Sequence, residues 1–171
     1  MIIEPSNLTP EEIYRLMSGI VVPRPIAWIT TVSDRGVINL APFSCFTFLS
    51  NQPPMLGINV GRKAGQRKDT GANIHARGQF VVNVGDFSHL NAIHESSAEH
   101  PPEVSETELL GLATLAGTTV DVPRPTVSAS FSDATSGVDP AKANAHHARR
   151  EPPDPLLCTG AREREIIMRM P

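Results

Sequence analysis

The chain has 171 residues, of which 19% are charged, and its formal net charge is −3. That length fits one domain with a hydrophobic core, and the weakly acidic balance disfavours nucleic acid as a partner because such binding needs a basic surface. No run of about 18 apolar residues is present, which excludes a membrane-spanning helix. The first residues carry no secretory signal, so we expect a soluble, cytoplasmic protein.

Cysteine and histidine spacing indicates neither a metal site nor a disulfide. Cys45 and Cys158 lie far apart and form no C-x-x-C pair, and a chain in a reducing compartment keeps its thiols reduced. The histidines match no common ligand spacing. We therefore assign no metal ligand and no catalytic side chain.

The first predicted element is a helix that begins after Thr9. Thr9-Pro10-Glu11-Glu12 is a capping box with proline at the first helical position, and apolar residues then recur at helical spacing until Gly19. A β-hairpin follows, because segments rich in apolar and β-branched residues flank an Asp34-Arg35-Gly36 turn. Prolines before the first strand place its beginning near Ile26, and the second strand is expected over 37–49.

Alternating apolar residues predict two further strands, at 56–60 and 80–84. Between them a short helix is expected over 68–77, with Asp69 or Thr70 as its N-cap and a glycine at its end. The chain therefore crosses from one core strand to the next through a loop and a helix.

Three shorter elements complete this part of the chain. We expect a helix capped by Ser88, a second helix over 103–110 and a return to strand over 118–122. The predicted fold class is mainly β with short helices, α+β.

The composition changes after Pro125. Large apolar residues become sparse and prolines cluster near position 153, a composition that buries little surface. We expect residues 1–125 to form the domain and residues 126–171 to form an irregular or disordered tail.

A basic segment follows the strand at 56–60 and opens the helix at 68–77. It reads Gly61-Arg62-Lys63-Ala64-Gly65-Gln66-Arg67-Lys68-Asp69-Thr70, and cations next to a helix N-terminus favour phosphate binding. The glycine and lysine spacing is not that of a Walker loop, so nucleotide triphosphate hydrolysis is not indicated. The alternative is a solvated basic loop.

A second segment places small polar residues among aromatic ones within a predicted strand. It reads Asn39-Leu40-Ala41-Pro42-Phe43-Ser44-Cys45-Phe46-Thr47, and polar groups in such a position need hydrogen-bond partners. A flat heteroaromatic ligand would provide them. The alternative is an edge strand with one solvated face.

Several segments follow one another in a characteristic order. They are Val22-Pro23-Arg24-Pro25-Ile26-Ala27, Asn39-Leu40-Ala41-Pro42-Phe43-Ser44, Pro53-Pro54, Gly61-Arg62, Lys68-Asp69-Thr70 with Asn73-Ile74, Phe80-Val81-Val82-Asn83-Val84, and Ser105-Glu106 with Leu109-Leu110-Gly111-Leu112. Taken in order, these segments resemble the flavin reductase-like family. The resemblance covers roughly the first 125 residues and implies a split β-barrel that binds FMN and forms a homodimer.

The resemblance also implies the cofactor contacts. The isoalloxazine and ribityl contacts would be Asn39, Ala41, Ser44, Cys45 and Phe46. The phosphate contacts would be Arg62, Lys68, Asp69 and Thr70, with Arg24 as a further cofactor contact. All of this requires that the basic turn and the Ser44 segment meet in space.

The sequence after Pro125 departs from the family, whose members continue with further barrel strands. If those further strands are missing, the barrel is incomplete at its C-terminus. A replaced or out-of-frame C-terminus would account for the change. The other reading frames of the coding DNA test this hypothesis, and it fails if none of them encodes barrel-like strands.

The activity implied by the resemblance is hydride transfer from NADH or NADPH to bound FMN. Electrons would then pass to a free flavin, a partner oxygenase or another acceptor. The flavin carries this chemistry, so no side-chain acid or base is obligatory. The alternative is a non-catalytic FMN-binding protein or a decayed member of the family.

Overall fold

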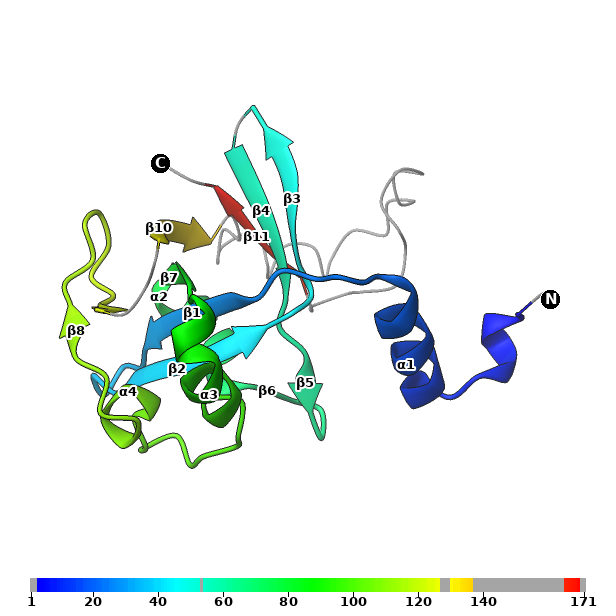
Figure 1. Ribbon diagram of the computed structural model, residues 1–171, viewed down its shortest axis with the longest axis horizontal. Helices are drawn as coiled ribbons and strands as arrows, with labels where there is room; N and C mark the ends of the chain where they lie inside the picture. Colours follow the sequence, from blue (N-terminus) through cyan, green and yellow to red (C-terminus); the bar gives the residue numbers. More distant parts are fainter. Residues whose placement is uncertain (1–2, 53, 127–129, 137–164, 170–171) are drawn as a thin grey trace, which may run out of the picture.

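The computed structural model describes residues 3–52, 54–126, 130–136 and 165–169 (Figure 1). Its main element is an antiparallel sheet with the strand order β2-β1-β7-β10-β11-β4-β3. The strands are β1 (Ala27–Val32), β2 (Ile38–Phe43), β3 (Phe46–Asn51), β4 (Pro54–Asn59), β7 (Gln79–Val84), β10 (Ser130–Ser136) and β11 (Glu165–Arg169).

Short helices and two small ribbons surround this sheet. The ribbons pair β5 (Arg62–Lys63) with β6 (Gln66–Arg67) and β8 (Thr114–Leu115) with β9 (Arg124–Pro125). The helices are η1 (Pro5–Asn7), α1 (Pro10–Ile20), α2 (Asp69–Arg77), η2 (Phe87–His89), α3 (Leu90–Glu95) and α4 (Glu106–Leu109). The predicted α+β class, mainly strands with short helices, is confirmed.

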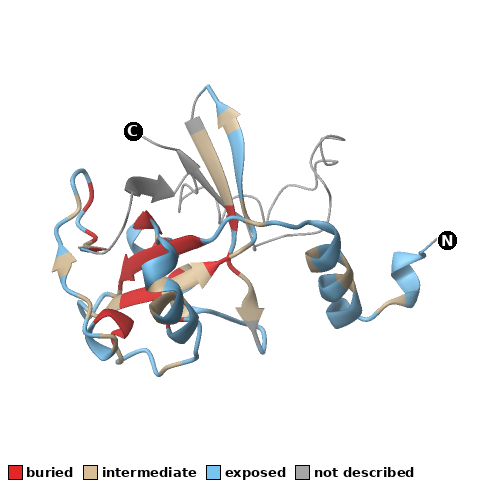
Figure 2. Ribbon diagram, in the orientation of Figure 1, coloured by how far each residue is buried: buried red, intermediate tan, exposed pale blue. Residues whose placement is uncertain are grey.

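Helix α1 has the predicted capping box. The Thr9 hydroxyl accepts from the backbone N–H of Glu12 at 3.3 Å, and the Glu12 carboxylate accepts from the backbone N–H of Thr9 at 2.8 Å. The helix ends at Ile20, one residue beyond the predicted glycine stop. None of its residues is buried, and it stands away from the sheet (Figures 1 and 2).

The predicted hairpin is confirmed for its first strand and only half right for its second. Strands β1 and β2 pair in antiparallel register, with Thr30 opposite Leu40. The segment expected as one strand over 37–49 is two strands, because the chain changes partner at Ser44 and Cys45 and β3 then pairs with β4. Apolar residues continue on both sides of this break, so composition does not reveal it.

Two hydrophobic clusters lie on the two faces of the sheet. One consists of Ala27, Ile29, Phe43, Ile58, Val60, Ile74, Phe80 and Val82. The other consists of Val32, Val81, Val120 and Val122. The side chain of Trp28 is also fully buried, and its indole N–H donates to the Ser96 hydroxyl at 2.9 Å. Strand β1 is buried along its whole length, as Figure 2 shows.

Several predicted caps and ends differ from the observed ones. The N-cap of α2 is Lys68, not Asp69 or Thr70. The helix begins at Asp69, so both predicted caps lie within its first turn. Ser88 does not cap the helix expected after it, because the N-cap of α3 is His89. Ser88 lies instead in η2, whose N-cap Asp86 accepts from the backbone N–H of Ser88 at 2.8 Å.

The segment predicted as a strand over 118–122 is irregular. Val120 and Val122 are buried in the second cluster all the same. Burial of alternate valines therefore occurs here without strand pairing, and periodicity alone does not distinguish the two cases.

Two segments beyond Pro125 are strands, so the prediction of an irregular tail is wrong for them. Strand β10 pairs with β7, and β11 pairs with β10 and β4. In β10, backbone pairing to an exposed strand edge has overridden a mostly small and polar sequence, whereas β11 carries three large apolar residues of its own. Most of the remaining predicted tail lies outside the described residues. Within the described residues the sheet does not close into a barrel, since β2 and β3 are its outer strands.

Candidate functional site

The predicted polar strand and the helix after the basic turn meet at one buried hydrogen bond. The amide nitrogen Nδ2 of Asn39 on β2 donates to Thr70 Oγ1 in the first turn of α2 at 2.9 Å. Both residues are buried, with exposed fractions of 7% and 2%. A second bond, from Asn73 Nδ2 to Thr31 Oγ1 at 3.0 Å, holds α2 against β1. The polar strand thus contacts the helix that follows the basic turn, whereas the meeting of the turn itself with Ser44 stays a prediction.

The basic turn is a tight hairpin between β5 and β6. Ala64 and Gly65 both have positive φ, 46° and 79°, which is the backbone of a two-residue turn with a right-handed strand twist. Arg62 lies opposite Arg67 in the register, and its Nη1 donates to the carbonyl of Gly65 at 2.9 Å. Lys68 follows directly, so three cations lie close to the beginning of α2.

The beginning of α2 is suited to an anion. Its N-cap, Lys68, makes no side-chain capping hydrogen bond and has an exposed side chain. The first N–H groups of a helix have no partner within the helix and carry the positive end of its dipole. Asp69 in the first turn acts in the opposite direction, because its carboxylate repels an incoming anion.

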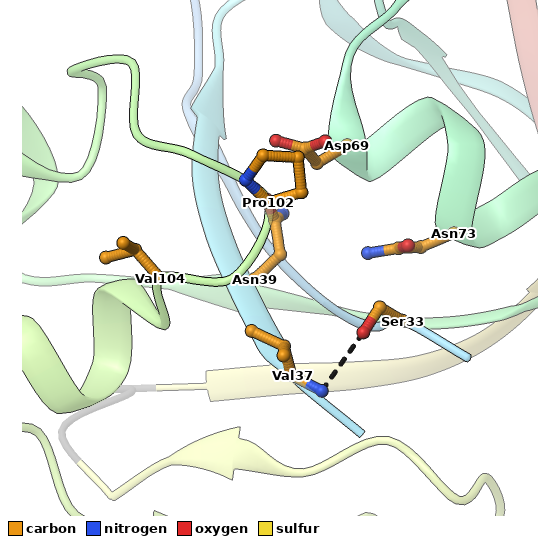
Figure 3. A pocket seen from close by; sticks show the side chains of 7 residues that line it. All are labelled: Ser33, Val37, Asn39, Asp69, Asn73, Pro102 and Val104. Carbon is orange, nitrogen blue, oxygen red and sulfur yellow. Dashed lines mark hydrogen bonds between the residues drawn. The ribbon is translucent and has the colours of Figure 1, made fainter. Parts of the chain in front are cut away.

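A cavity of about 30 Å³ lies between β2, α2 and the segment before α4 (Figure 3). Its polar lining comes from Ser33, Asn39, Asp69 and Asn73, and Val37, Pro102 and Val104 complete it. Ser33 Oγ accepts from the backbone N–H of Val37 at 3.0 Å, as Figure 3 shows. This volume holds about one water molecule. An isoalloxazine ring would therefore have to lie on a more open part of the surface.

The remaining predicted ring contacts lie at the end of β2 and in the bend after it. Ala41 and Phe46 pack against the first hydrophobic cluster. Between them, Ser44 is half-buried and Cys45 is exposed. The carbonyl of Cys45 accepts from the backbone N–H of Asn59 at 2.9 Å, which ties the bend to the end of β4.

Arg24 has a structural role that the sequence did not predict. Its Nη1 donates to the carbonyls of Ser18 and Val21, the latter at 2.8 Å, and so caps the end of α1. These bonds hold Arg24 beside α1 rather than beside the Asn39–Thr70 contact. Its role as a cofactor contact stays a prediction.

Residues 17–135 match the family described as the flavin reductase like domain. The chain belongs to this flavin reductase-like family. The predicted resemblance, made from the motifs between Val22 and Glu106, is thereby confirmed.

Relatives of this flavin reductase-like chain are longer than the chain itself. It is 47% identical over 124 residues to an uncharacterized protein of Halalkalibacterium halodurans, covering 72% of the chain and 59% of the relative. It is 40% identical over 122 residues to an uncharacterized protein of Bacillus subtilis, covering 71% and 60%. The chain thus spans less than two thirds of the length of either relative.

Solved structures support the same fold. Nitrilotriacetate monooxygenase component B from Bacillus cereus superposes with a TM-score of 0.81 and 32% identity, over 99% of this chain and 78% of that one. The 2-nitrobenzoate 2-nitroreductase of Pseudomonas fluorescens gives 0.77 and 28%, over 99% and 74%. A Shewanella frigidimarina protein with a split barrel domain, 18% identical with a TM-score of 0.69 over 96% and 73%, supports the fold alone.

One buried residue beside this flavin reductase-like site was not among the predicted contacts. Glu106 of α4 is 6% exposed, and its Oε2 accepts from the backbone N–H of Leu40 at 2.9 Å. Burial raises the pKa of its carboxyl and the charge of Asp69 adds to the rise, while the Leu40 N–H and the charge of His100 lower it. Because a charged residue is normally exposed, the residue type did not indicate that Glu106 is buried. The signal that could have pointed to it is its position in the Ser105-Glu106 segment of the family resemblance.

A larger, open hollow lies elsewhere, between α3 and α4. It measures about 640 Å³ and is lined by His94, Glu95, Ser97, Ala98, His100, Leu109 and Leu110. None of the predicted cofactor contacts is among these residues. In the part of the chain that the structure describes, no three histidine, cysteine or acidic residues are grouped to hold a metal ion. The described helices include none with the length and hydropathy needed to cross a bilayer.

Proposed function

We propose that this chain is the FMN-binding part of an oxidoreductase of the flavin reductase type. NADH or NADPH would be its electron donor, and a free flavin or a protein such as an oxygenase its acceptor. The observation that carries the proposal is the Asn39–Thr70 hydrogen bond. It joins the polar strand to the helix behind the basic turn in a member of the flavin reductase-like family.

The residues around the beginning of α2 fit a phosphate group. Arg62 offers a planar pair of donors and Lys68 a point charge, which together suit phosphate oxygens. Thr70 Oγ1 accepts from Asn39, and its hydroxyl proton remains able to donate. We propose that Arg62, Lys68, Asp69 and Thr70 hold the phosphate end, with Asp69 acting through the helix rather than by direct contact.

The end of β2 and the bend after it fit the ring end of the cofactor. We propose that Asn39, Ala41, Ser44, Cys45 and Phe46 form this part, where half-buried polar groups adjoin an apolar surface. When bound, a flavin accepts a hydride from a nicotinamide and passes electrons to a second acceptor. The protein's task is then to orient the ring and leave one face accessible.

Anaerobic titration of the purified protein tests this function. We expect a yellow protein whose flavin absorbance is bleached by NADH or NADPH and returns when an acceptor is added. A yellow protein that neither nucleotide bleaches would favour the non-catalytic alternative. A protein that stays colourless after incubation with FMN would exclude both.

The exposed apolar face of α1 supports a homodimer. Ile13, Leu16, Met17 and Ile20 recur on one face of this helix, and Met17 and Ile20 are 54% and 66% exposed. An isolated helix of 11 residues is marginally stable in water. We propose that a second copy of the chain covers this face.

Substitution of Met17 by glutamate is expected to convert a dimer into a monomer, because it places a charge in the middle of the apolar face. Sizing chromatography with light scattering measures the change. Arg15→Ala is the matched control, since Arg15 lies on the opposite, polar face in an exposed ion pair with Glu11. A monomeric wild-type protein, or a dimeric Met17→Glu variant, would contradict the proposal.

A further inference from the structure

Helix α4 approaches the outer edge of β2. Strand β2 ends the described sheet and pairs with β1 on its inner side. Along an antiparallel pair, alternate residues direct their N–H and C=O groups to opposite sides. Leu40 directs its N–H outward to Glu106, and Pro42, two residues on, has no N–H to satisfy. Glu106 therefore provides the acceptor that a further strand would otherwise supply.

The position of Glu106 is fixed by its neighbours. Ser105 and Thr107 are buried, with 7% and 1% of their surfaces exposed, and their hydroxyl oxygens lie 2.8 Å apart. The carbonyl of Glu106 accepts from the backbone N–H of Leu110 at 3.0 Å. The carboxylate thus reaches Leu40 from a short but well-anchored turn.

Two successive residues of β2 are therefore held by two different helices. Thr70 of α2 accepts from the side chain of Asn39, and Glu106 of α4 accepts from the backbone of Leu40. Ala41, the next residue, lies against the first hydrophobic cluster. The segment that we propose to contact the flavin ring is thus clamped between α2 and α4.

We propose that Glu106 is a positioning residue that sets the backbone of Asn39–Ala41 for cofactor binding without touching the cofactor. This inference rests on the proposed function. A buried N–H that loses its acceptor is costly, so the strand would shift or admit water when the acceptor is removed. Binding groups tolerate displacements of only about 0.5 Å before affinity falls.

Three variants separate positioning from general stability. Glu106→Ala removes the acceptor, whereas Glu106→Gln keeps an acceptor oxygen without the charge. Ser96→Ala is the control, because it also removes a buried hydrogen-bond partner, that of the Trp28 indole, while the bonds made by Asn39 and Leu40 do not involve Ser96. Because burial raises the pKa of the Glu106 carboxyl, the measurements are made at about pH 8, where ionisation is more favoured than at neutral pH.

Two measurements on each variant decide the matter. The first is FMN affinity by fluorescence quenching: we expect a loss of about tenfold or more for Glu106→Ala, and about threefold or less for Glu106→Gln and Ser96→Ala. The second is amide hydrogen exchange of Leu40 in the flavin-free protein, which should accelerate in Glu106→Ala and stay slow in Glu106→Gln.

The outcomes distinguish the inference from the function on which it rests. Equal FMN affinity in wild type and Glu106→Ala would overturn the positioning role while leaving the proposed function intact. Equal losses in Glu106→Ala and Ser96→Ala would reduce the effect to general destabilisation and would also overturn it. Failure of the wild-type protein to bind FMN would remove the proposed function and the positioning role together.

Discussion

Replacing Lys68 with alanine is expected to weaken FMN binding by about 10-fold to 100-fold, because a hydrogen bond to a charged group contributes about 1.5–3 kcal/mol. Lys68 is exposed at the N-cap of α2, so its removal should leave the fold intact. Riboflavin, which lacks the phosphate, should bind the variant and the wild type equally. Parallel titrations with FMN and riboflavin measure the difference.

The matched control for Lys68 removes the same charge from the other end of the same helix. Arg77 lies in the last turn of α2, and its Nη1 donates to the carbonyl of Ser33 at 3.2 Å. Arg77→Gln should change FMN affinity little. If the two variants lose affinity equally, net charge rather than a local contact governs binding, and the phosphate would not lie at the beginning of α2. If Lys68→Ala lost affinity for FMN and riboflavin equally, the phosphate would likewise not lie at the beginning of α2.

Local sequence rules predicted the elements whose signals lie within a few residues. The capping box at Thr9 and the glycine at the end of α2 are examples, since Gly78 has a φ of 69°. The expectation that the segments of Asn39 and Thr70 lie in one site had a different basis. Periodicity placed the strand and the helix, but the resemblance to a family supplied the expectation that they share a site.

What the sequence did not predict depends on contacts between distant residues. The break at Ser44 and Cys45 exists because β3 pairs with β4, a choice that no local pattern records. Strand β10 pairs with β7 although its sequence, Ser130–Ser136, is mostly small and polar. Such pairing uses backbone groups, which every sequence possesses. The role of Glu106 was hidden for a related reason, because its partner is the backbone of Leu40.

Two phenylalanines seven positions apart test the packing on which the site depends. Phe80 of β7 is fully buried in the first hydrophobic cluster together with Ile29 and Ile74, which support the Asn39–Thr70 contact from β1 and α2. Phe80→Ala is expected to lower the free energy of unfolding by about 3–5 kcal/mol, through lost burial and the cavity left behind. Phe87 is 88% exposed, so Phe87→Ala should change stability by about 0.5 kcal/mol or less.

Urea unfolding followed by Trp28 fluorescence measures both variants, because the indole is fully buried. A loss of that size is a large part of the 5–15 kcal/mol that typically stabilises a domain, so Phe80→Ala should also bind FMN weakly at 37 °C. Cooling that restores its fold should restore binding, since Phe80 is not a proposed cofactor contact. Similar stabilities for the two variants would mean that β7 is not the buried centre of the sheet, and the placement of β1 and α2 around it would then be wrong.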